Sequence, residues 1–432
     1  MSDPAAPAPA RKPFGLLFMI VLVDMIGFGI MIPLLPFYAR KFEASNIEVT
    51  LLLSVYAFCQ FVAAPVLGSL SDKVGRRPVL IFSQIGSGLA SITLAIASIY
   101  EFGDPTVGLI IIYASRIVDG ISGGNISAAQ AYVSDITAPD QRAKYMGMLG
   151  AGFGIGFTVG PAIGGVLGHF NPALPPLAAA IFSFTAAFLC YLRLPETVNV
   201  KGRGDSERLE KNAPPKKSQL ARSIALMRQP ILLQVNCVWF LSMFAFVTAE
   251  AVFALYLADK FGFGKLGVGL AFTLAGVVII IVQGKLIGPL TRAIGEWHLA
   301  TIGPIVFAVG MVVYTETVNH PLMWLLVVGI LFNAFGRSMQ TPAMSSIVSH
   351  QSPSSEQGAA FGLFHGMGSL ARVGGPALAG FLYDRSMHAP FILAAGLTLA
   401  AGAWMGLVRL QVRASKKSTD APQPAQSIVE TP

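Results

Sequence analysis

Long apolar runs separated by short polar connections dominate the sequence. Each run is about 20 residues or longer, which is the length that a helix needs to cross the roughly 30 Å hydrocarbon core of a bilayer. The pattern predicts an all-α integral membrane protein with twelve transmembrane helices. The runs fall at 14–38, 49–71, 78–100, 107–134, 142–168, 175–194, 231–257, 266–289, 299–317, 321–349, 357–383 and 389–410.

A polar segment at 196–230 divides the twelve runs into two sets of six. It contains Pro214 and Pro215 and no apolar run of membrane-spanning length, so we interpret it as a linker. The Ala- and Pro-rich start of the chain is expected to be disordered. The predicted organisation is a disordered cytoplasmic tail (1–13), an N-terminal six-helix bundle (14–195), a cytoplasmic linker (196–230), a C-terminal six-helix bundle (231–410) and a cytoplasmic tail (411–432).

Short internal repeats relate the two sets of runs. The sequence GSLSDKVGR at 68–76 recurs as GPLTRAIGE at 288–296, and GPAIGG at 160–165 recurs as GPALAG at 375–380. Each pair occupies equivalent places in the two sets. This predicts two pseudo-symmetric bundles that keep the same orientation in the membrane.

The composition agrees with a bilayer as the surrounding medium. Hydrophobic residues make up 54% of the chain and charged residues 12%, a balance that would leave large apolar patches on a soluble domain. The net charge of +8 does not indicate nucleic-acid binding, because the basic residues are spread over the loops. When alternate loops are assigned to opposite sides, 21 Lys and Arg residues fall on the side of both termini and 5 on the other. The positive-inside rule therefore predicts a multi-pass inner (plasma) membrane protein with both termini cytoplasmic.

The polar turn between the second and third runs has the sequence GSLSDKVGRRPVL (68–80). Read on its own, it is a short basic loop in which glycine permits a sharp reversal. The turn nevertheless resembles the signature loop of the major facilitator superfamily, Gly-x-Leu-x-Asp-Arg/Lys-x-Gly-Arg-Arg. The matching residues are Gly68, Leu70, Asp72, Lys73, Gly75, Arg76 and Arg77. The resemblance implies the major facilitator fold and a cytoplasmic gate at this loop.

Within that gate, the resemblance gives Asp72 and Arg76 a place in a charge network that latches the two halves together. The second-half copy of the loop carries Arg292 in place of Asp72 and Glu296 in place of Arg76. The same latch is therefore not implied for the second half.

The fourth run contains the sequence RIVDGISGGN (116–125). An arginine inside the membrane is costly unless it is paired, and it is functional by default. Asp119 lies three residues after Arg116, so a purely structural ion pair on one helix is one interpretation. The segment also resembles the fourth-span motif of the superfamily, Arg-x-x-x-Gly, which Arg116 and Gly120 match. That resemblance implies a part in proton transfer.

Two further motifs resemble the antiporter branch of the superfamily. In the fifth run, small residues permit close helix packing, which alone explains them, but the pattern Gly-x-x-x-Gly-Pro-x-x-Gly-Gly is also that branch's fifth-span motif. The matching residues are Gly156, Gly160, Pro161, Gly164 and Gly165. The first run, VDMIGFGIMIPLLPFY, resembles twelve-span drug:proton antiporters, including tetracycline exporters, through Asp24, Gly27, Gly29, Pro33 and Pro36.

Charged and polar residues inside the runs supply the remaining candidates. Those for proton coupling are Asp24, Glu250, Arg116 and Asp119, with the alternative that Asp24 simply neutralises Arg116. Other polar residues, among them His365 and Arg372, are expected mainly to form hydrogen bonds between helices. The possible substrate-cavity residues are Tyr56, Gln60, Gln234, Asn333, Arg337 and Gln340.

No phosphate-binding loop, HExxH, CxxC or GxSxG motif is present, which argues against ATP-driven pumping and against an enzyme. The sequence predicts a monomeric secondary transporter without cofactor or metal, which uses the proton gradient to export a small amphipathic or lipophilic compound by alternating access. One alternative is a proton symporter that imports a metabolite. The other is a membrane receptor or scaffold that does not transport, which would have no reason to retain intramembrane carboxylates.

Overall fold

The computed structural model describes residues 11–137, 141–197, 226–353 and 356–419, and helices build these ranges. The predicted tail residues 1–10 and 420–432 and most of the predicted linker, 198–225, lie outside the described residues. The helices of the N-terminal half are α1 (Arg11–Met31), η1 (Ile32–Leu34), α2 (Leu35–Arg40), α3 (Asn46–Val74), α4 (Arg76–Ile99), α5 (Pro105–Gly123), α6 (Ile126–Ile136), α7 (Arg142–Phe170) and α8 (Leu174–Arg193).

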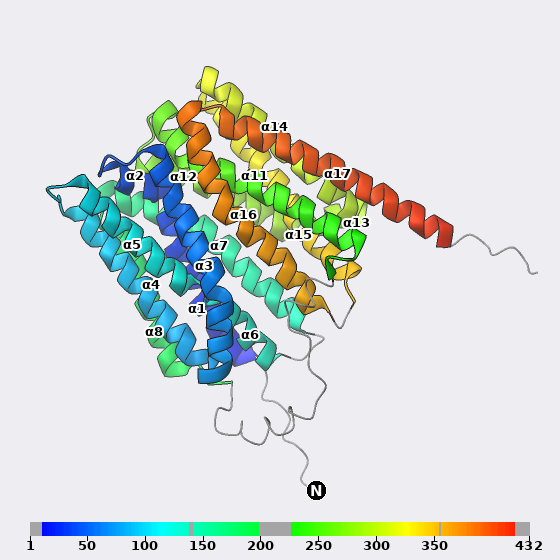
Figure 1. Cartoon of the computed structure of the whole chain (residues 1–432), viewed down its shortest axis with the longest axis horizontal. Helices are drawn as coiled ribbons and strands as arrows, with labels where there is room; N and C mark the ends of the chain where they lie inside the picture. Colours follow the sequence, from blue (N-terminus) through cyan, green and yellow to red (C-terminus); the bar gives the residue numbers. More distant parts are fainter. Residues whose placement is uncertain (1–10, 138–140, 198–225, 354–355, 420–432) are drawn as a thin grey trace, which may run out of the picture.

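The C-terminal half repeats this arrangement of long helices joined by short turns (Figure 1). Its last helix continues to Thr419, beyond the end of the apolar run at 410. The helices are α11 (Pro230–Phe261), α12 (Lys265–Ile281), the π-helical turn η3 (Val282–Leu286), α13 (Ile287–Ile294), α14 (Glu296–Asn319), α15 (Met323–Gln351), α16 (Gln357–Arg385) and α17 (Ala389–Thr419).

Local chemistry sets the ends of several helices. Ser45 and Glu48 form a reciprocal capping box at the start of α3. Gly75, between α3 and α4, has a φ of 108°, and Gly295, between α13 and α14, has a φ of 80°; glycine adopts such conformations without steric cost. These two glycines occupy the same position of the internal repeat, so the same break recurs in both halves.

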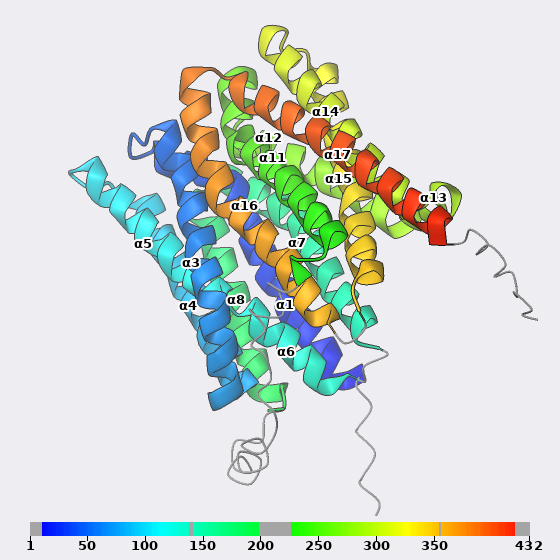
Figure 2. The same cartoon turned by 45° about the vertical axis from the view of Figure 1, so that its right-hand side comes forward.

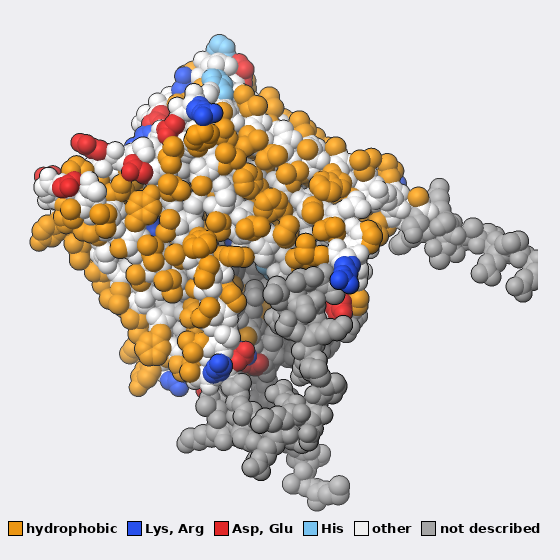
Figure 3. Space-filling view, viewed as in Figure 1, with side chains coloured by type: hydrophobic (Ala, Val, Ile, Leu, Met, Phe, Trp, Pro, Cys, Tyr) orange, Lys and Arg blue, Asp and Glu red, His pale blue; other side chains and the backbone are white. Residues whose placement is uncertain are grey.

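Nine helical segments among the described residues are long and apolar enough to cross a membrane. The 29-residue helices α7, α15 and α16 are not among the nine, and the described apolar part of α7 is Gly154–Phe170. Figure 3 shows hydrophobic side chains over the broad face of the molecule, with charged side chains gathered towards its ends. The chain is thus a multi-pass helical membrane protein, and the count of twelve spans stays a prediction.

Helix pairs α7–α12 and α3–α16 join the two halves (Figures 1 and 2). Small residues allow α7 to approach α12 closely. A Cβ on Gly165 of α7 would lie only 3.0 Å from the Cα of Gly269 on α12. On another face of α7, a Cβ on Gly160 would lie 2.7 Å from the Cα of Gly29 on α1. Helix α7 therefore packs its glycines against both its own half and the opposite half.

The hydrogen bonds that join the halves within the described ranges gather at one end of the molecule. Arg40 forms an ion pair with Asp259, with Nη1 2.5 Å from Oδ1, and Tyr383 donates a hydrogen bond to the same carboxylate. Nearby, the Asn46 amide donates to Asp384 over 2.8 Å. We call these five residues the clasp.

The opposite end of the molecule carries the α3–α4 turn and the start of the linker, and we call it the linker end. Helix α16 begins there. A Cβ built on Gly358, Gly362 or Gly366 would meet no described atom within 4 Å, and His365 on the same stretch is exposed. This glycine face of α16 therefore has no close described neighbour, whereas its other face packs on α11 through Phe364.

Candidate functional site

Arg116 is buried in α5 and forms an ion pair on its own helix. Its Nη1 lies 3.1 Å from Oδ2 of Asp119, one turn further on, while its Nε has no hydrogen-bond partner. Gly120 lets α5 approach α3, because a Cβ there would lie 2.5 Å from the carbonyl oxygen of Tyr56. The ion pair is therefore held close to the part of α3 that carries Tyr56.

Asp24 lies on α1, close to this pair but outside it. The side chains of Gln84 on α4 and Asn125 at the start of α6 flank its carboxylate, and its charge interacts with that of Asp119. Among the described residues it forms no ion pair. In this structure the ion-pair partner of Arg116 is thus Asp119, and not Asp24.

A small pocket lies beside Arg116, with Phe28 and Tyr56 in its wall. Its volume is about 10 Å³, roughly the room that one water molecule needs. The Tyr56 ring packs on Phe28 with centroids 5.0 Å apart, and the Tyr56 hydroxyl accepts a hydrogen bond from Gln60. The structure therefore brings Tyr56 and Gln60 together with the charged residues of the N-terminal half.

Glu250 on α11 is the carboxylate of the C-terminal half. Its charge interacts with Arg337 on α15 and with Arg372 on α16, but neither arginine forms an ion pair with a described residue. The charge of Arg372 also interacts with Tyr56 of the other half. Since Tyr56 lies beside Arg116, Arg372 connects the two charge clusters.

Arg337 is surrounded by aromatic and sulfur-containing side chains. Its guanidinium lies 3.9 Å from the ring centroid of Phe246 and 5.5 Å from that of Trp239. Nη2 is 3.0 Å from the thioether sulfur of Met243, a weak acceptor, and Nη1 has no hydrogen-bond partner. A buried guanidinium with so few acceptors is unusual, because unpaired buried donors are costly.

The other predicted cavity residues pack within the C-terminal half. The Gln340 amide donates to Ser242 over 2.7 Å, and Gln234 contacts Trp404 and Gln411 on α17. The backbone of Asn333 approaches α14, since its nitrogen would lie 2.8 Å from a Cβ on Gly310. The contacts of these three residues are with neighbouring helices and not with the charged side chains around Glu250.

Sequence reasoning placed Arg372 among polar residues expected mainly to form hydrogen bonds between helices, whereas its charge interacts with members of both charge clusters. No short motif marks this residue. The available signal was its position in the middle of a long, mostly apolar run, where a charged residue is functional by default.

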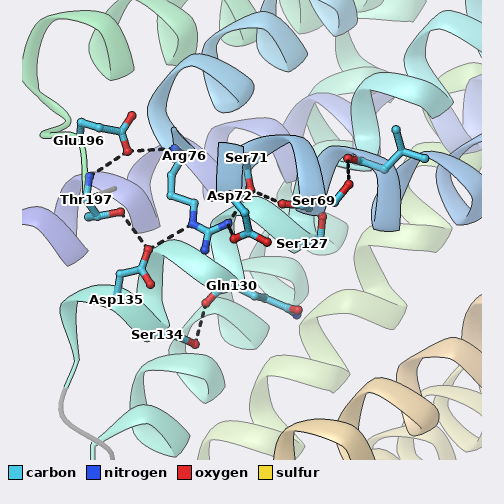
Figure 4. Close-up of polar contacts among 12 residues, drawn as sticks. Ser69, Ser71, Asp72, Arg76, Ser127, Gln130, Ser134, Asp135, Glu196 and Thr197 are labelled. Atoms are coloured by element: carbon cyan, nitrogen blue, oxygen red, sulfur yellow. Dashed lines mark hydrogen bonds and ion pairs between the residues drawn. The ribbon is translucent and has the colours of Figure 1, made fainter. Parts of the chain in front are cut away.

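The signature loop holds a second polar network at the linker end, shown in Figure 4. The Arg76 guanidinium lies 2.5 Å from Asp72, four residues before it, and 3.2 Å from Asp135 on α6. It also donates to the Ser71 hydroxyl. Arg76 therefore ties the turn between α3 and α4 to α6, within the N-terminal half.

Glu196, just after α8, completes the network. Its carboxylate accepts a hydrogen bond from the backbone N–H group of Arg76 (Figure 4) and another from that of Arg77. These amides lie in the first turn of α4 and have no partner within the helix, and a negative charge is favourable there. The first residue of the predicted linker is thus bound to the signature loop. Asp135 and Glu196 were not predicted as gate residues, because they are 59 and 120 residues from Arg76 in sequence.

The remaining residues predicted for the gate lie around this network. Gly68 faces Ser127 of α6, with a Cβ there 3.2 Å from the serine hydroxyl. Arg77 donates a hydrogen bond to the Tyr191 carbonyl of α8, and Lys73 is exposed. In the second half, Glu296 contacts Ser346 and His350 of α15. The two copies of the repeat therefore contact corresponding helices, through Arg76 in the first half and through Glu296 in the second half.

Comparisons with known proteins agree with this arrangement. The family model of the Major Facilitator Superfamily matches residues 17–322 and 240–431. A class C tetracycline resistance protein of Escherichia coli is 31% identical over 85% of this chain and 88% of its own length. Multidrug resistance protein 2 of Bacillus subtilis is 27% identical over 91% of this chain and 94% of its own length.

Solved structures show the same fold. A peptide transporter in complex with sulfate has a TM-score of 0.71 at 16% identity, covering 93% of this chain and 95% of its own. A human organic anion transporter has a TM-score of 0.67 at 24% identity, and the match covers 92% of this chain and 100% of that transporter. The helical architecture and the signature loop agree with the sequence similarity. The chain therefore belongs to the Major Facilitator Superfamily, and it is a transporter of small molecules and not an enzyme.

Proposed function

We propose that the protein is a proton-coupled antiporter of the inner (plasma) membrane that exports small amphipathic or lipophilic compounds. Relatives named as tetracycline and multidrug resistance proteins cover most of the chain, which supports drug efflux as the type of transport. The proton gradient supplies the energy, no cofactor is needed, and a monomer with cytoplasmic termini carries out the cycle.

The placement of Asp24 and Glu250 carries this proposal. The two carboxylates lie in opposite halves, next to charge clusters that Arg372 connects, and neither forms an ion pair with a described residue. An ionised carboxylate that is not held in a close ion pair is costly within a membrane. Such groups are suited to bind and release protons as their surroundings change, and a scaffold without transport has no use for them.

Alternating access is supported by the difference between the two ends of the molecule. The clasp joins the halves at one end, whereas the glycine face of α16 at the linker end has no close described neighbour. A state that faces the cytoplasm has this asymmetry. Export then requires the clasp to open while the linker end closes.

The experiment is transport by the purified full-length protein in proteoliposomes with an acidic lumen. Tetracycline and ethidium are added outside, and substrate uptake and lumenal pH are recorded together. We expect uptake with a rise in lumenal pH, and loss of both when nigericin collapses the gradient. Uptake that does not depend on the pH gradient would contradict proton coupling. Substrate that moves in the same direction as the protons would support the metabolite symporter instead.

A further inference from the structure

We infer that the C-terminal half holds a binding site for an anionic group, such as a carboxylate or sulfonate, carried by an aromatic cargo. Arg372 contacts the anion directly and Arg337 is the second cation of the site. The inference deepens the proposed transport function and rests on it for the identity of the ligand as cargo, but it is tested by equilibrium binding alone.

Arg372 is placed to receive a ligand. It lies midway along α16, and its side chain is exposed, although its charge interacts with Glu250 on α11 and with Tyr56 on α3. A side chain that faces two helices of opposite halves points into the space between the halves and not towards lipid. No described residue forms an ion pair with it, so its donors are open to a ligand.

Arg337 is a second cation of this cluster, and its hydrogen-bond donors are only partly used. One of its terminal nitrogens has no partner and the other contacts only the Met243 sulfur. Exchanging a thioether for an oxyanion would replace a weak acceptor by a charge-assisted hydrogen bond, which is about twice as strong as a neutral one. Arg337 and Arg372 interact electrostatically with each other and with the same carboxylate, that of Glu250, so both guanidinium groups belong to one charge cluster.

The charges in this part of the molecule favour a negative ligand. Two guanidinium groups, those of Arg337 and Arg372, face one carboxylate, that of Glu250. His365 also lies within electrostatic range of Arg372. In the N-terminal half the balance is opposite, because the cluster holds two carboxylates, those of Asp24 and Asp119, and one guanidinium, that of Arg116. A single anionic group bound near Arg372 would equalise the charges of the C-terminal cluster.

Aromatic side chains next to the arginines suit the apolar part of the cargo. Trp239 stacks on Phe364 with centroids 4.4 Å apart, and Arg337 lies over both Trp239 and Phe246. The indole N–H of Trp239 has no hydrogen-bond partner. The surroundings of the two arginines are therefore rich in aromatic rings, which suits a flat aromatic acid.

The probes are radiolabelled 1-naphthoate and its neutral isostere 1-naphthamide. Their equilibrium binding to the purified full-length protein in lipid nanodiscs is measured, with empty nanodiscs subtracted. We expect saturable binding of the anion with about tenfold higher affinity than the amide, equivalent to about 1.4 kcal/mol. No saturable binding of 1-naphthoate, or equal affinity for the two probes, would overturn the inference.

Three variants locate the preference. Arg372→Gln should remove the preference for 1-naphthoate over 1-naphthamide, and Arg372→Lys should keep most of that preference. Arg385→Gln, at the clasp end of the same helix and stacked on Phe381, should leave it unchanged. Thermal unfolding of each variant checks the fold, which Arg372→Gln should preserve because the side chain is exposed. An equal loss of affinity for both probes in Arg372→Gln would refute an anion site.

The outcomes also separate this inference from the proposed function. Proton-coupled drug transport by a protein that binds both probes equally would leave the function standing without the anion site. Conversely, a charge-dependent preference in a protein that shows no proton-coupled transport would leave the site standing without the antiport.

Discussion

Arg76 illustrates how far single residues could be understood from the sequence. The signature loop marked Arg76 and Asp72 as members of a charge network, and their contact is local, four residues apart. Asp135 and Glu196 complete that network from distant parts of the chain, and no sequence pattern joins residues so far apart. The contacts described here lie within one half, whereas the resemblance implied a latch between halves.

We expect Asp72→Asn to slow transport about tenfold, which corresponds to about 1.4 kcal/mol in the barrier, while substrate affinity stays within twofold or so of the wild type. Asp72 holds Arg76 at the linker end, apart from the cluster around Arg116 and Glu250. The measurement compares initial transport rates in proteoliposomes with equilibrium binding. Glu101→Gln, an exposed carboxylate between α4 and α5 and outside the signature loop, is the control. Normal transport by Asp72→Asn would show that the ion pair is dispensable.

The helices were predictable as elements because apolar runs of membrane-spanning length have few other interpretations. Breaks inside the runs were not predicted. Pro33 lies in the 3₁₀ turn that follows α1, and Gly124 separates α5 from α6. The π-helical turn η3 interrupts the eighth run without a proline. Such breaks depend on packing against neighbouring helices, which an apolar pattern does not specify.

Helix α7 offers a matched pair of glycines to test close packing. We expect Gly160→Ala to destabilise the protein by about 1–3 kcal/mol, the typical cost of overpacking, because its Cβ would lie 2.6 Å from the carbonyl carbon of Gly29. Gly154→Ala, where a Cβ meets nothing within 4 Å, should be neutral or slightly stabilising, since alanine favours helix. Thermal unfolding in one detergent measures both. Equal effects at the two positions would argue against the α1–α7 contact.

For the whole molecule, the sequence indicated two halves in the same orientation, and the recurring glycine conformation at Gly75 and Gly295 agrees with that repeat. The clasp could not be predicted, because Arg40 and Asp259 are 219 residues apart and each looks like an ordinary loop charge. Its ion pair is partly exposed, and such pairs contribute about 0–1 kcal/mol. A contact of that size suits a connection that opens in each cycle of the proposed transport.

We expect Asp259→Arg to shift the population away from the clasped state, because it places two cations against each other. The charge-swapped double variant Arg40→Asp/Asp259→Arg should restore it. Spin labels introduced at Glu101 and His320, on a cysteine-free background, report the separation of the halves at the clasp end by double electron–electron resonance. If Asp259→Arg leaves the distance distribution unchanged, the clasp does not hold this state.

Coupling of substrate movement to proton movement through Asp24 and Glu250 is the central claim. The most direct measurement records substrate-induced proton flux and downhill substrate exchange in proteoliposomes for the wild type, Asp24→Asn and Glu250→Gln. Glu101→Gln, in an exposed turn, serves as the control carboxylate. The account predicts that each of the two variants loses proton flux but retains exchange. Proton flux that survives both substitutions would contradict it.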